Sequence, residues 1–215
     1  MIRSNELLLG FDAREMWLEP QDEWPASRKK MYLLRDDVSR PLSTDTMVWR
    51  TVFDADTTLP RPEWIGPMMG LWENLATLQQ YLETAWRARM QHFWLIAVTL
   101  QHEGAQRDSL IERYAATADI IPALRDPAWA LLGYDVSDQW LLSGLSNCGY
   151  GTNGSELQTL RETYASSLNE HHLFASLQPA VDFRQLSDKR VPEHAPFFVF
   201  GLWLISKEAG LAHPD

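Results

Sequence analysis

The sequence contains one cysteine, Cys148, and an internal disulfide needs two. Cysteine usage therefore excludes a disulfide-stapled secreted scaffold and fits a reducing compartment. Long apolar runs are missing as well. The two longest, starting at Phe93 and Phe197, fall well short of the ~20 residues that cross a bilayer. The N-terminal run 7–9 is too short for a signal-peptide core. These absences predict a soluble, cytoplasmic protein that does not bind membranes.

Basic residues are scarce, with 19 Lys and Arg against 29 Asp and Glu and a formal net charge of -10. Such a chain repels a nucleic-acid backbone and attracts a basic protein. Glycine-rich phosphate motifs are missing too, because neither GxxxxGK[ST] nor GxGxxG occurs. The sequence therefore predicts no nucleic-acid partner and no cofactor.

Tryptophan, in contrast, is abundant. Ten of the 215 residues are Trp, in a chain that is 45% hydrophobic and 22% charged. Large rings stabilise a protein when they are buried in a core or placed in an interface. This composition predicts a packed globular protein.

Periodicity and proline spacing predict a mixed α+β fold, with apolar strands covered by amphipathic helices, in a single domain over 1–215. The order of elements suggests two related halves, about 1–120 and 121–215. The order of the strands stays open. The predicted helices are 68–90, 106–118, 155–168 with Ser155 as a cap, and 173–186, which Pro179 weakens. The predicted strands are 7–11, 31–34, from 48, from 92, 128–138 and from 196.

Two pairs of aspartates lie where predicted strands end. Asp54 and Asp56 lie in FDADT, and Asp135 and Asp138 lie in YDVSD. Carboxylates at strand ends serve acid–base or metal chemistry in some α/β enzymes, whereas Asp at a turn commonly accepts hydrogen bonds from backbone amides. Both readings stay open. In an acidic chain these four residues are also our candidates for contact with a basic partner.

Neither cysteine nor histidine forms a catalytic or metal signature. Cys148 lies among Gly and Ser with no nearby base, which favours a small packed thiol. Glu170 precedes the adjacent His171 and His172, and Glu193 precedes His194. Neighbouring side chains on a helix diverge by ~100°, so adjacent histidines do not share a metal there. We expect a helix end or a polar loop near His171 and a buried, hydrogen-bonded His194. No catalytic, cofactor-binding or metal residue is predicted.

Two segments, LLGYDVSDQWLLSGLSNCGY and DKRVPEHAPFFVFGLW, resemble bacterial immunity proteins of contact-dependent inhibition and related toxin systems. The resemblance implies a non-enzymatic cytoplasmic inhibitor that binds one cognate toxin. Because many such toxins are basic nucleases, it also implies a partner of that kind.

Two other classes of function stay open. One is a small metal-dependent hydrolase that uses the aspartates and histidines. The other is a structural or regulatory subunit that associates through an apolar patch. The oligomeric state is left open, and a monomer is compatible with the inhibitor hypothesis.

Overall fold

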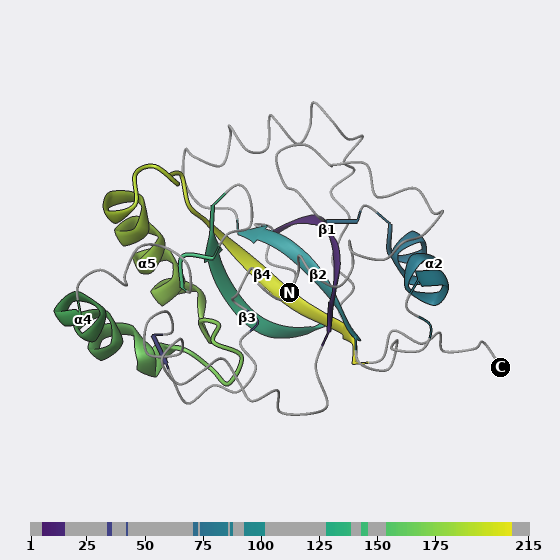
Figure 1. The fold of residues 1–215 in the computed structure, drawn as a ribbon, viewed down its shortest axis with the longest axis horizontal. Coiled ribbons are helices and arrows are strands. Elements are labelled where there is room, and N and C mark those ends of the chain that lie inside the picture. Colours follow the sequence, from purple (N-terminus) through teal and green to yellow (C-terminus); the bar gives the residue numbers. More distant parts are fainter. Residues whose placement is uncertain are drawn as a thin grey trace. The chain divides into compact units, whose positions relative to one another are not determined.

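The computed structural model describes residues 6–15, 34–35, 42, 71–72, 74–85, 87, 93–101, 128–138, 143–145 and 154–207. Strands and helices both occur, which confirms the predicted α+β class. Figure 1 labels the elements except the short 3-10 helix η4. They are β1 (Glu6–Glu15), α2 (Leu75–Ala85), β2 (Phe93–Gln101), β3 (Ala130–Ser137), α4 (Gly154–Tyr164), η4 (Ala165–Ser167), α5 (Leu177–Arg190) and β4 (Phe198–Ser206).

The strands form a four-stranded antiparallel sheet in the order β1-β2-β4-β3. β2 and β4 are the continuous apolar runs, and in both of them consecutive residues are buried, as in strands covered on both faces. The register of β1 against β2 shifts between Leu8 and Gly10. A Cβ at Gly10 would stand 2.7 Å from the carbonyl oxygen of Trp72, so this close approach requires glycine.

The helix predicted over 68–90 is confirmed only as α2, because the described chain is not helical at 71–72. Trp72 instead pairs with Phe11 of β1 through two backbone hydrogen bonds of 2.7 and 2.8 Å. The helix begins after Asn74, whose Oδ1 accepts from the amides of Ala76 (2.8 Å) and Thr77 (3.2 Å). Asn74 is therefore the N-cap, which sequence periodicity did not reveal.

Two further helix boundaries differ from the prediction. Ser155 lies inside α4 as its second residue, so it is not the cap. The last helix begins at Leu177 instead of 173, because Phe174 forms bridges with Tyr134 and Leu168. Pro179 lies in the first turn of α5, where its missing N–H breaks no helical hydrogen bond, and the helix extends to Arg190.

The chain divides into two compact units. The first comprises residues 1–16, 46–131 and 202–215, and the second comprises 17–45 and 132–201. The predictions of a single domain and of two related halves stay predictions. The predicted strand from 48 and helix 106–118 lie outside the described residues, as does the strand predicted over 31–34 apart from Leu34, which lies in a bend.

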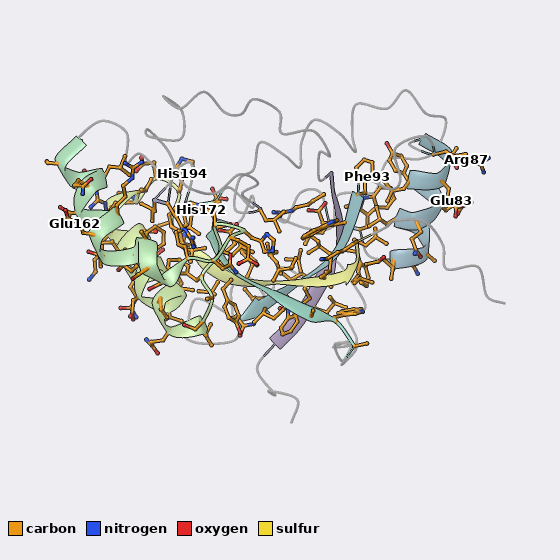
Figure 2. The ribbon with its side chains drawn as sticks, turned by 90° about the horizontal axis from the view of Figure 1, so that it is seen from below. Glu83, Arg87, Phe93, Glu162, His172 and His194 are labelled. Carbon is orange, nitrogen blue, oxygen red and sulfur yellow. The ribbon has the colours of Figure 1, made fainter. Side chains whose placement is uncertain are left out.

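The core of the first unit lies between α2 and the strands. Figure 2 shows Phe93 beside α2, with Glu83 and Arg87 on the opposite side of that helix. The rings of Trp72 and Tyr81 pack with their centroids 4.9 Å apart. The buried members of this core are Phe11, Ala13, Trp72, Leu78, Tyr81, Leu82, Phe93, Leu95, Ala97 and Trp203.

The core of the second unit is built on α4, α5, β3 and the start of β4. α4 and α5 lie side by side (Figure 1), and Arg190 of α5 forms an ion pair with Glu156 of α4. Between them, Phe183 packs edge-on against Tyr164 at a centroid distance of 5.1 Å and contacts Phe174 at 5.5 Å. The buried members are Leu34, Tyr134, Val136, Leu145, Leu157, Leu160, Leu168, Phe174, Ala180, Phe183, Val191, Phe197 and Val199.

Tyr164 gives this core a pH dependence. Burial, and then the negative charge of Asp182, raise the pKa of its phenol above the usual 10.0. The unfolded chain therefore loses this proton at a lower pH than the folded chain. The contribution of the protonated phenol to the free energy of unfolding is complete below pH 10 and is lost as the pH rises above it. We expect Tyr164→Phe to lose less stability than wild type between pH 9 and pH 11, measured by urea unfolding. Equal slopes for the two proteins would contradict this assignment.

Among the described residues, no helix is long and apolar enough to cross a membrane.

Candidate functional site

Polar side chains gather at the end of β3 in the second unit. The carboxylate of Asp135 accepts hydrogen bonds from the amide of Val136 (2.8 Å), the hydroxyl of Ser137 (3.1 Å) and the hydroxyl of Ser143 (2.7 Å). Ser143 in turn accepts from the amide of Leu145 at 3.2 Å. Asp135 thus ties the turn 143–145 to the strand.

Asp135 is only 6% exposed, and its bonds stay within the chain. A carboxylate held by three donors inside the protein stabilises a local turn. This placement favours the turn interpretation of Asp135 over direct contact with a partner.

Asp138 follows β3 directly and is fully buried, at 0% exposure. Its Oδ2 lies 3.0 Å from Nδ1 of His194, whose side chain is 40% exposed. An ionised carboxylate can only accept, so Nδ1 is the donor and the neutral ring keeps an acceptor at Nε2. A buried acid therefore orients a histidine at the surface.

The turn after α5 brings His194 to Asp138. The amide of His194 donates to the carbonyl of Val191 at 3.0 Å, and Val191 donates to the carbonyl of Ser187 at 2.9 Å. The chain then returns toward α5, because the amide of Phe197 donates to Asp188 Oδ1 at 2.7 Å. The position of His194 thus follows from how α5 ends.

The pair of Asp138 and His194, which we name the Asp138–His194 pair, can act in two ways. Nε2 of His194 can accept a proton from a bound molecule, as a general base does. It can also accept a hydrogen bond from a donor on a partner protein. Glu193 is exposed beside it and adds a negative charge at the surface.

Comparisons with protein family models, curated proteins and solved structures give no match.

His171 and His172 lie in the turn after η4, which confirms the polar loop expected there (Figure 2 labels His172). His171 is half-buried, and its Nε2 lies 3.8 Å from Glu170. His172 is completely buried, with φ at 56°. Within the described part of the chain, no three His, Cys, Asp or Glu side chains are grouped to hold a metal ion.

The first unit contains a buried ion pair that was not predicted from the sequence. Arg14 Nε donates to Asp12 Oδ2 at 3.0 Å, and these residues of β1 are only 7% and 3% exposed. Their spacing of two residues, which places both on one face of a strand, was the available signal. Asp12 also accepts from the amide of Ala13 at 2.8 Å, so the pair is a structural element of β1.

Asp54, Asp56 and Cys148 lie outside the described residues. The partner-binding role of the two aspartates and the packed-thiol role of the cysteine stay predictions.

Proposed function

We propose that this chain is a non-enzymatic cytoplasmic inhibitor of the immunity type, which binds and neutralises a basic toxin domain. The proposal is supported by a contact between the two segments of the chain that resemble immunity proteins. Asp138 belongs to the segment 131–150 and His194 to 188–203, and their side chains form a 3.0 Å hydrogen bond. The two segments therefore meet at this hydrogen bond.

On this proposal, Asp138 acts through His194. The acid is buried and cannot itself touch a partner, whereas the turn after α5 is exposed at Glu193 and at His194. The net charge of -10 attracts a basic partner over a distance. At close range, the oriented Nε2 of His194 accepts a hydrogen bond from a donor on that partner.

The test begins with the reading frame beside this gene, because a toxin is expected there. The purified toxin domain and this chain should bind, with an association rate that falls as salt is raised, and coexpression should protect cells. We expect Glu193→Lys to slow association by a factor of about five. Glu170→Lys is the matched control, because Glu170 is equally an exposed turn glutamate. If the neighbouring toxin is neither bound nor neutralised, the proposal fails.

The Asp138–His194 pair favours a second candidate, a small hydrolase. In such an enzyme Nε2 of His194 takes the proton of an attacking water and returns it to the leaving group, while Asp138 orients the ring. Hydrolysis of p-nitrophenyl acetate should then fall at least about tenfold in His194→Gln. His171→Gln, also a histidine in a turn, is the control. Equal rates for wild type and both variants would exclude this candidate.

A further inference from the structure

His172 holds a distant part of the chain by accepting two hydrogen bonds at one nitrogen. Its Nε2 accepts from the backbone amide of Leu34 at 3.1 Å and from that of Arg35 at 3.3 Å. The contact joins residues 138 positions apart within the second unit. In the sequence, His172 is a candidate base or metal ligand near a polar loop, and no local pattern indicates this long-range contact.

Two further hydrogen bonds to backbone carbonyls reinforce the connection. The guanidinium of Arg35 donates to the carbonyl of Leu168 at 2.7 Å, and the amide of Leu42 donates to the carbonyl of His171 at 2.8 Å. Leu34 is 1% exposed and belongs to the core of the second unit. Residues 34, 35 and 42 are therefore fixed to the turn that carries His172.

The turn itself is rigidly supported. Asn169 Oδ1 accepts from the amides of His171 (2.9 Å) and Leu173 (3.2 Å), while its Nδ2 donates to the carbonyl of Leu132 at 2.6 Å. The amide of His172 donates to the carbonyl of Asn169 at 3.0 Å. The imidazole is thus held in place by its own backbone, in a left-handed conformation that histidine tolerates better than most residues.

The protonation state of His172 follows from its partners. A neutral imidazole has one donor and one acceptor nitrogen, and Nε2 faces two N–H donors, so the proton is on Nδ1. Protonation would place a third N–H against those two amides and a positive charge on a fully buried ring. Among the described residues of the two joined segments, the charged and titratable groups beside His172 in the chain or at its contact are Arg35, Glu170 and His171.

We propose that His172 is an acid-sensitive latch, which fixes residues 34 and 35 to the turn while neutral and releases them when protonated. The latch is independent of the inhibitor and hydrolase proposals. As the pH falls below about 6.5, the usual pKa of a histidine in a flexible chain, protonation of the released ring makes opening of the contact more favourable. One proton is taken up on opening. Below the midpoint of protonation of the released ring, opening therefore becomes about tenfold more favourable for each pH unit by which the pH falls.

Amide hydrogen exchange in the full-length protein tests the latch. Protection of the Leu34 and Arg35 amides, corrected for the intrinsic pH dependence of exchange, should fall about tenfold per pH unit below the midpoint in wild type. His172→Gln supplies a side-chain oxygen that accepts at any pH, so the protection should become independent of pH. His171→Gln, one residue away, should behave as wild type. Constant protection in wild type between pH 7.5 and pH 5, or an unchanged dependence in His172→Gln, would overturn the proposal.

A second measurement needs no variant. Nitrogen chemical shifts of the His172 ring should show an unprotonated Nε2 at neutral pH, and its titration should coincide with the loss of protection at Leu34 and Arg35. A protonated Nε2 at neutral pH would equally overturn the proposal.

Discussion

Replacing Gly133 by alanine is expected to lower the free energy of unfolding by about 4 kcal/mol. Gly133 in β3 has a φ of +148°, a conformation that L side chains rarely adopt. A Cβ there would also stand 2.7 Å from Cβ of Leu173 and 2.9 Å from the carbonyl oxygen of Phe174. Backbone strain and steric overlap therefore add.

The surroundings of Gly133 cannot move aside easily. On one side, Tyr134 and Phe174 exchange two backbone hydrogen bonds of 2.9 Å. On the other, Asn169 Nδ2 donates to the carbonyl of Leu132 at 2.6 Å. Relief of the overlap would break these bonds, which also support the turn of His172.

Urea unfolding of Gly133→Ala beside Gly144→Ala measures this effect. Gly144 also lies in the second unit, but the nearest atom to its added Cβ is the carbonyl oxygen of Val136 at 3.2 Å, and its φ lies outside the strained range. The control should lose no more than about 1.5 kcal/mol. A Gly133→Ala protein as stable as the control would show that β3 adapts to a side chain at this position.

The second large effect is expected at Phe183 of α5. Phe183 is fully buried between Tyr164 and Phe174, so Phe183→Ala leaves a cavity that its neighbours fill only in part. We expect a loss of about 3 to 5 kcal/mol in the free energy of unfolding. Because the turn with His194 follows α5 directly, loosening the helix should also weaken the hydrogen bond between His194 and Asp138.

Gln185→Ala is the matched control, since Gln185 lies two residues away on the exposed face of the same helix. It should change stability by no more than about 0.5 kcal/mol. The ring nitrogen shifts of His194 should differ from wild type in Phe183→Ala and not in the control. An unchanged stability in Phe183→Ala would mean that the three rings do not form a cooperative core.

Strands were easier to predict than helix boundaries. β2 and β4 are apolar runs bounded by polar residues, and this pattern depends only on near neighbours in the chain. The start of α2 was wrong because Trp72 pairs with Phe11, which is 61 positions away and leaves no local signal. The start of α5 was wrong for the same reason, since Phe174 pairs with Tyr134 across the second unit.

The candidate site was predicted in part. The sequence pattern singled out Asp138, and we predicted from it a buried, hydrogen-bonded His194. The hydrogen bond is present, but the side chain of His194 is 40% exposed. Asp135 was a candidate for partner contact; its burial and its hydrogen bonds with the amide of Val136 and two serine hydroxyls favour the turn-stabilising alternative, and the partner-binding role stays a prediction. An aspartate at a strand end looks the same in a sequence whether it faces a turn, a histidine or a partner.

The sequence by itself determined the α+β class, the apolar strands, the central turns of the helices and the acidic balance, because each depends on composition or on residues a few positions apart. Only the tertiary structure decided which side chains meet. Asp138 forms a hydrogen bond with His194, 56 positions away in the chain, and His172 forms one with the amide of Leu34, 138 positions away. Such pairings follow from the packing of whole elements, and short-range periodicity carries no information about them.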